Sequence, residues 1–178
     1  MNKKIWNAKG KQQSDEVVSF LAAEDIKLDK SIFIYDIDAT SAHARGLSSI
    51  GIIKKSELAK IIKTLNELKQ KFVDGSFKLT NKYEDCHSAI EFYLTKKLGD
   101  IGKKVHTGRS RNDQVLVAMR LFAKQNLIDL KKENKLVAKT FIKLAKKYEN
   151  DSMPGYTHLQ RAMPSSWGLW FSAYAESF

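Results

Sequence analysis

Apolar residues recur at helical spacing along most of the chain. They follow the period of an amphipathic helix from near Ser56 to Gly75, and again from the acidic pair Glu84-Asp85 to Gly99. Ser56 is the predicted N-cap of the first segment, and glycines such as Gly75 and Gly99 commonly end helices. The pattern therefore predicts two ordinary helices joined by a short polar loop, and it contains no strand-rich region.

A much longer helix is predicted after Gly108. No glycine or proline occurs between Gly108 and Pro154, and an apolar stripe runs through most of this interval. About 36 helical residues would extend roughly 54 Å at ~1.5 Å per residue, which is far longer than a typical globular helix. Such a helix needs a partner surface of similar length, so a helical bundle is expected. Pro154-Gly155 ends the stripe, and a loop carrying Thr157 and His158 is expected there.

The C-terminal segment predicts one more helix, which Pro164-Ser165-Ser166 opens. The apolar pattern still runs at Phe178, where its aromatic residues would be exposed unless something covers them. The chain therefore reads as truncated at its C-terminus. We predict an all-α protein with a small N-terminal helical domain (1–108), followed by the first part of a long-helix bundle domain (109–178).

Charge and composition narrow the class of protein. The 178 residues carry a formal charge of +11, which raises the question of a nucleic-acid partner. Most lysines lie in helical stretches with apolar periodicity, which is typical of solvated helix faces, so no nucleic-acid partner is predicted. No stretch approaches the ~20 apolar residues of a membrane span, and the start of the chain does not resemble a signal peptide. With Cys86 as the single cysteine, a soluble cytoplasmic protein without a membrane partner is expected.

The start of the long helix carries candidate ligand-binding chemistry. Arg109 and Arg111 alternate with Ser110 and Asn112 in this turn. The N–H groups of a helix N-terminus and the forked donors of arginine both bind carboxylates. The turn therefore predicts a small acidic ligand, and a basic, capped helix start is the alternative interpretation.

Two histidines have candidate roles. His158 lies beside Thr157 on the expected loop, and an imidazole suits proton transfer near neutral pH; a structural histidine is the alternative. His87 follows Glu84-Asp85-Cys86, a run that suggests metal ligation. It has no distant Cys/His partner in the sequence, so an acidic helix start is the other interpretation and no metal is predicted.

Segments 83–91, 103–114 and 153–164 together resemble signature regions of the argininosuccinate lyases, a branch of the fumarase/aspartase superfamily. The run Thr107–Gln114 is specific to that branch. The resemblance implies a mostly helical fold and elimination of fumarate from argininosuccinate to give arginine, the last step of arginine biosynthesis, without a cofactor. It also implies a homotetramer whose sites combine residues from three subunits.

The resemblance also implies residue roles. His158 would take part in proton transfer, either directly or by supporting a serine. Asp25 stands where the family has a substrate-contacting serine, and a carboxylate there would repel an acidic substrate. His43 follows Ala39 and Thr40, which replace the family's Gly and Ser, and is expected to be structural. The expected substrate-binding residues are Arg111, Asn112, Thr157, Ser110, His87 and Asp29.

The largest departure from the family lies in the length of the chain. Family enzymes are considerably longer and carry a later Gly-Ser-Ser-x-Met-Pro-x-Lys-x-Asn loop with a catalytic serine, which this sequence lacks. We therefore expect no measurable lyase turnover from the 178-residue chain alone. A non-catalytic derivative of the fold, a sister lyase acting on adenylosuccinate, and a basic helical module for nucleic acid are the alternatives.

Overall fold

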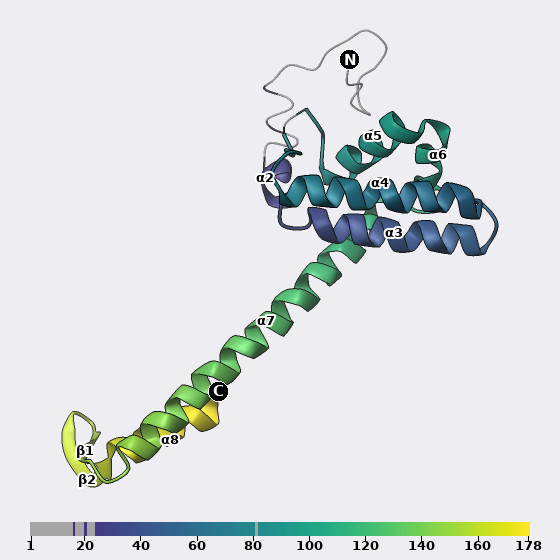
Figure 1. Ribbon diagram of the computed structural model, residues 1–178. Coiled ribbons are helices and arrows are strands. Elements are labelled where there is room, and N and C mark those ends of the chain that lie inside the picture. The colour runs from purple at the N-terminus through teal and green to yellow at the C-terminus, as the bar shows by residue number, and fades with distance from the viewer. Residues whose placement is uncertain (1–15, 17–19, 21–23, 81) are drawn as a thin grey trace. The chain divides into compact units, whose positions relative to one another are not determined.

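The computed structural model describes residues 16, 20, 24–80 and 82–178 (Figure 1). The chain forms two compact units, residues 1–123 and residues 124–178, and the long helix α7 (Arg111–Lys147) belongs to both. The domain boundary predicted after residue 108 falls in the turn before α7 and stays a prediction.

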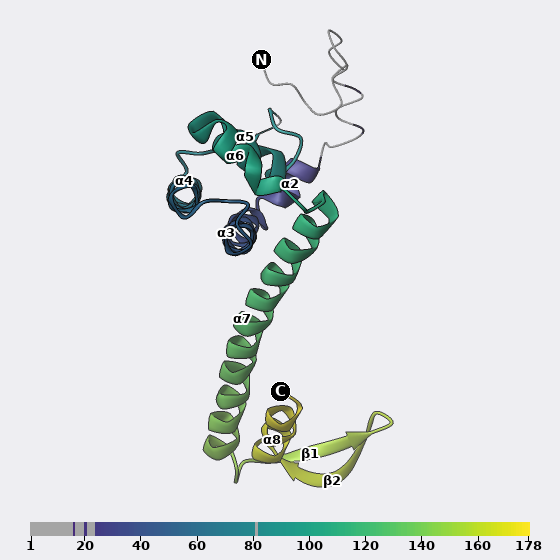
Figure 2. The same cartoon turned by 90° about the vertical axis from the view of Figure 1, so that its right-hand side faces the viewer.

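Short and medium helices build the first unit. Helices α3 and α4 lie side by side (Figure 1), and Figure 2, which looks almost along their axes, shows α5 next to both. The start of α7 follows a short 3-10 helix, η1. The elements before α7 are α2 (Asp25–Asp29), α3 (Phe33–Ser49), α4 (Lys55–Val73), α5 (Cys86–Leu98), α6 (Asp100–Lys103) and η1 (Lys104–His106).

The predicted apolar faces form the core of this unit. Ile61, Leu65 and Leu68 are fully buried on one face of α4, at the spacing that places side chains on one side of a helix. Phe33 at the start of α3 is also fully buried, and its ring centroid lies 4.5 Å from that of Phe72. Apolar periodicity alone therefore located the buried side of α4.

Helix α4 begins earlier than the sequence predicted. Its N-cap is Lys54 rather than Ser56. The Lys54 N–H donates to a carboxylate oxygen of Glu57 at 2.9 Å, and Glu57 also pairs with Lys104 Nζ at 2.8 Å. The Glu57 side chain thus accepts the N–H of the N-cap residue Lys54, as in a capping box. Ser56 lies inside the first turn of the helix.

A close approach of α6 to α5 sets the path of the chain toward α7. Gly99 ends α5 with a φ of 59°, a conformation that favours glycine. A Cβ on Gly102 would lie 2.5 Å from the backbone of Leu94, so only glycine fits at this contact. The two glycines hold the end of α5 against α6 and lead directly into η1.

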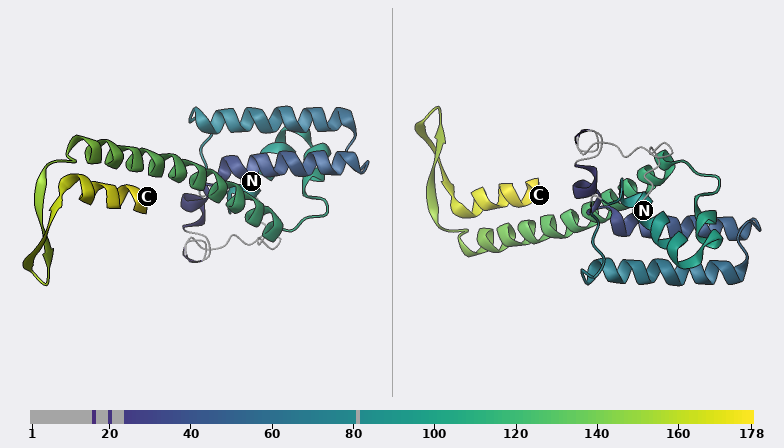
Figure 3. Two further views of the ribbon diagram at one scale, coloured as in Figure 1. Left: turned by 90° about the horizontal axis from the view of Figure 1, so that it is seen from below. Right: turned by 90° about the horizontal axis from the view of Figure 1, so that it is seen from above.

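The second unit consists of the later part of α7, a β-hairpin and α8 (Trp167–Ser177) (Figure 3). The ring of Phe141 on α7 stacks on that of Tyr174 on α8, with centroids 5.4 Å apart. A Cβ on Gly168 would lie 2.4 Å from Glu149 Cα, so the two segments touch through backbone there. The predicted long helix is confirmed, with 37 residues. None of the described helices is long and apolar enough to cross a membrane.

The segment expected to be a loop is a β-hairpin, which the sequence analysis missed. Strand β1 (Ser152–Thr157) pairs antiparallel with β2 (Gln160–Ser166), and Pro154 lies opposite Pro164. A residue before proline is restricted to extended backbone, which favours strands at both positions. Because the strands lack the β-branched alternation that marks most hairpins, the pattern did not reveal them. The fold remains mostly helical, as predicted.

Candidate active site

The turn before α7 is held by side chains of α3. His43 Nε2 lies 2.9 Å from the carbonyl oxygen of Thr107, and an Arg109 guanidinium N–H donates to Thr40 Oγ1 at 3.1 Å. Burial lowers the pKa of Arg109. These contacts support the predicted structural role of His43, and the hydroxyl of Thr40 holds the Arg109 side chain.

Ser110 and Asp113 cap the start of α7 reciprocally. The Ser110 N–H donates to Asp113 Oδ2 at 2.8 Å, and the Asp113 N–H donates to Ser110 Oγ at 3.4 Å. This is the capping-box arrangement, which satisfies free N–H groups of the first turn. Asn112 lies exposed in the same turn. The capped helix start is therefore present, and the substrate roles of Ser110 and Asn112 stay predictions.

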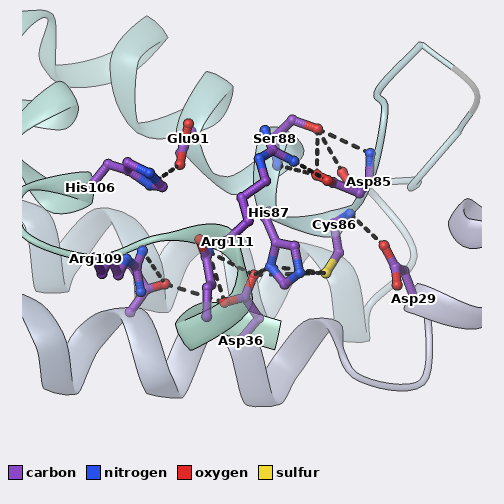
Figure 4. A network of polar contacts seen from close by, with 12 residues as sticks. Asp29, Asp36, Asp85, Cys86, His87, Ser88, Glu91, His106, Arg109 and Arg111 are labelled. Carbon is purple, nitrogen blue, oxygen red and sulfur yellow. Dashed lines mark hydrogen bonds and ion pairs between the residues drawn. The ribbon is translucent and has the colours of Figure 1, made fainter. Parts of the chain in front are cut away.

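Arg111 is paired with the N-cap of α5. An Arg111 guanidinium N–H donates to Asp85 Oδ2, while the Ser88 N–H donates to Asp85 Oδ1 at 2.7 Å (Figure 4). Burial acts to raise the pKa of Asp85, but the hydrogen bonds from Ser88 and the charge of Arg111 outweigh it and lower that pKa. Arg111 NH2 is buried and has no hydrogen-bond partner among the described residues. The guanidinium thus has donor capacity left for a ligand.

His87 lies in a buried polar network that joins three helices. Its Nδ1 is 2.6 Å from Asp36 Oδ2, and its side chain is only 3% exposed (Figure 4). Gln114 Nε2 donates to both Asp36 oxygens, at 3.0 and 3.2 Å. Because an ionised carboxylate only accepts, Nδ1 carries the proton of the first contact. His87 on α5 is thereby fixed to α3 and to the first turn of α7.

The charges around His87 favour its protonated form. Burial acts to lower the pKa of His87, but its hydrogen bond to Asp36 and the charges of Asp36, Asp85 and Asp29 outweigh it and raise that pKa. Asp29 on α2 accepts the Cys86 N–H at 2.8 Å, and burial raises the pKa of Asp29. Two predicted site residues, Asp29 and His87, are therefore neighbours, whereas Asp25 lies exposed on α2.

Asp36, Cys86 and His87 are also the described residues that come nearest to a metal site. Their ligand atoms lie within 4.8 Å of one another. Two ligands on one zinc ion, each at about 2.0–2.1 Å, are separated by well over 3 Å in tetrahedral geometry, whereas Asp36 Oδ2 and His87 Nδ1 are 2.6 Å apart. Burial also raises the pKa of the Cys86 thiol, which disfavours a thiolate ligand. The cluster fits a direct hydrogen bond rather than metal coordination.

The raised pKa of His87 predicts a pH-dependent stability. A group whose pKa is higher in the folded state stabilises the folded state. The stabilisation is complete at pH values below the group's ordinary pKa, here 6.5, and it is lost as the pH rises through the pKa of the folded state. We expect the unaltered chain to have a higher free energy of unfolding than the His87→Asn variant, and this difference to be larger at about pH 6 than at about pH 9. Urea unfolding followed by circular dichroism measures the difference. Leu68→Ala, a buried change without a titrating group, serves as the control, and an equal difference at both pH values would contradict the prediction.

The other two predicted residues belong to the second unit. Thr157 ends β1, and His158 and Leu159 form the hairpin turn with φ values of 50° and 63°. The side chains of Thr157 and His158 are both exposed at this turn. Left-handed backbone is uncommon for such residues and often marks functional segments.

The structure adds two residues to the surroundings of His87 that the sequence analysis missed. Asp36 and Gln114 have relative exposures of 0% and 1% and both belong to the His87 network. A signal was present for Asp36, because a carboxylate inside the apolar run Ile34–Ile37 requires a buried partner. Gln114 lay in the recognised motif but was assigned no role.

Comparison with known proteins places the chain in a family. A family model described as Lyase matches residues 10–178, which is most of the chain. The chain belongs to this lyase family. The resemblance to argininosuccinate lyases is thus confirmed at the level of the family.

Curated relatives match almost the whole chain. The chain is 47% identical over 174 residues to an argininosuccinate lyase of Xylella fastidiosa (strain Temecula1 / ATCC 700964), covering 98% of this chain and 39% of the relative. It is 46% identical over 178 residues to that of Xanthomonas euvesicatoria pv. vesicatoria (strain 85-10), covering 100% and 41%. The chain therefore spans about two fifths of the length of these relatives.

Several solved structures share the fold of this chain. An EDDS lyase in complex with formate matches with a TM-score of 0.71 at 24% identity, over 94% of this chain and 33% of that one. A fumarate lyase:delta crystallin from Brucella melitensis matches with a TM-score of 0.66 at 15% identity, over 96% and 40%. At these identities the likeness establishes the common helical architecture.

Proposed function

We propose that this chain supplies part of the active site of an argininosuccinate lyase, which eliminates fumarate from argininosuccinate and leaves arginine. The observation that carries the proposal is the 47% identity to a relative of that name across 98% of the chain. The geometry of the first unit supports it, since Arg111 NH2 has no hydrogen-bond partner among the described residues and the surroundings of His87 favour its charged form. An elimination next to a carboxylate builds up negative charge, and such groups stabilise it.

The proposed roles follow from this chemistry. Arg111, Ser110, Asn112 and Thr157 position the carboxylates and the amino-acid part of the substrate, and His158 takes part in proton transfer. No cofactor, membrane or nucleic acid is needed, and the working protein is a cytoplasmic homotetramer. Exposed leucines on the helices of the second unit support assembly, because Leu127, Leu130 and Leu169 are each 65% exposed.

A chimaera tests the proposal. Residues 1–178 are followed by the part of the Xylella fastidiosa relative that lies beyond the aligned region. We expect this chimaera to release fumarate from argininosuccinate, and the 178-residue chain alone to show no turnover. Adenylosuccinate is offered in parallel, and a preference for it would assign the sister activity instead. A folded chimaera without activity on either substrate would favour a non-catalytic derivative of the fold.

A further inference from the structure

The buried carboxylate of Asp36 stands at the centre of the first unit's polar network. It contacts His87 of α5, Gln114 of α7 and, at 3.5 Å, the hydroxyl of Thr40 one turn along α3. Its side chain is 0% exposed, so it costs stability unless each oxygen is satisfied. Because the Asp36 carboxylate has no contact with solvent, its hydrogen bonds and its charge act on the neighbouring side chains.

Gln114 fixes the orientation of that carboxylate. Its Nε2 donates to both oxygens of Asp36, and Gln114 is itself 1% exposed. Gln114 Oε1 has no hydrogen-bond partner in the described part of the chain. Because α7 begins three residues earlier with Arg111, the carboxylate is tied directly to the turn that carries the predicted ligand-binding residues.

The second nitrogen of His87 has only a weak partner. Nε2 lies 3.9 Å from Cys86 Sγ, and no other described atom makes a hydrogen bond with it. The pKa of the Cys86 thiol is raised by burial, so the sulfur stays neutral, and a neutral thiol is a weak hydrogen-bond group. A buried imidazole nitrogen without a good partner is unusual and requires an explanation, such as a ligand.

Three carboxylates act on the ring of His87 from the elements packed against it. Asp36 comes from α3, Asp29 from α2 and Asp85 from the N-cap of α5, while Arg111 of α7 neutralises Asp85. Asp36 touches the ring directly, whereas Asp29 contacts the backbone of Cys86. Asp36 therefore controls the ring more directly than the other carboxylates do.

We propose that Asp36 is a positioning residue for His87: it takes the Nδ1–H hydrogen bond, fixes the ring, and leaves Nε2–H to donate to an anionic ligand. The proposal rests on the proposed function, because it assigns His87 to the site of an acidic substrate. An imidazolium held in this way presents one N–H donor in a fixed direction, which suits a carboxylate.

Nitrogen NMR of the 178-residue chain tests the first half of the proposal without any substitution. The shifts of both His87 ring nitrogens report which of them carries a proton. We expect Nδ1 to be protonated throughout the titration of the ring, and a neutral form protonated only at Nε2 would overturn the proposal. In Asp36→Asn, which keeps an acceptor but removes the charge, the titration midpoint of His87 falls. In Asp38→Asn, an exposed change on the same helix, the titration midpoint of His87 is expected to stay unchanged.

Kinetics of the chimaera test the second half. Asp36→Asn is expected to lower kcat/KM for argininosuccinate at least about tenfold and to move the pH profile in the same direction as the NMR midpoint, while Asp38→Asn leaves both unchanged. An unchanged pH profile in a folded Asp36→Asn chimaera would overturn the positioning role while the proposed function stands. If the unaltered chimaera is inactive, the proposed function fails. The NMR measurement of the His87 ring nitrogens then decides by itself whether Asp36 positions His87.

Discussion

His158→Asn in the chimaera is expected to lower kcat by about 10²- to 10⁴-fold, the usual contribution of a group that transfers a proton in the transition state. Asparagine keeps the size and polarity of the side chain and tolerates the left-handed backbone at this position, where φ is 50°. The hairpin therefore remains intact while the titrating group is lost. Release of fumarate under saturating argininosuccinate measures the effect.

The control for this change lies on the same hairpin. Tyr156→Phe removes one exposed hydroxyl from β1 and leaves the backbone unaltered, so little change in kcat is expected. A His158→Asn chimaera that retains the parent rate would remove His158 from the reaction. The structural interpretation of this histidine would then be the correct one.

Phe33→Ala is expected to lower the free energy of unfolding of the first unit by about 3–5 kcal/mol, the range for truncating a buried aromatic ring. Phe33 has no exposed surface, and its ring lies against those of Phe72 and Phe77, with centroids 4.5 and 5.6 Å away. The change leaves a cavity where α3, α4 and the following loop meet. Urea unfolding followed by circular dichroism gives the difference.

The comparison variant is Phe92→Ala on α5, whose side chain is 42% exposed. Its loss should be nearer 1 kcal/mol, as for most substitutions outside the core. Equal losses for the two variants would mean that the aromatic cluster around Phe33 does not stabilise the unit.

The helices could be predicted because each signal lies within one segment. The apolar period located α4 and α7, and the acidic start of α5 at Asp85 and its end at Gly99 agree with the structure. The hairpin could not be predicted in this way. Its strands are short and rich in polar residues and proline, and the non-glycine turn His158-Leu159 lacks the usual hairpin signal.

The site was predictable only in its motif-bearing half. Ser110, Arg111 and His87 stood out as residue types at particular places, but the partner of His87 lies 51 positions away, inside an apolar run. Periodicity assigns a residue to a face, and it carries no information on which buried polar group meets which. Asp36 and Gln114 therefore became visible only once α3, α5 and α7 were placed in space.

The ion pair between Arg111 and Asp85 has a consequence for ligand exchange. Asp85 already provides one guanidinium nitrogen of Arg111 with a carboxylate, so an anion that binds this nitrogen competes with Asp85, whereas NH2 has no competing partner among the described residues. The net attraction gained at this position is the difference between two similar contacts. Under the proposed function, the product fumarate is thus displaced by a side chain that is always at hand, and its release does not leave an uncompensated buried charge behind.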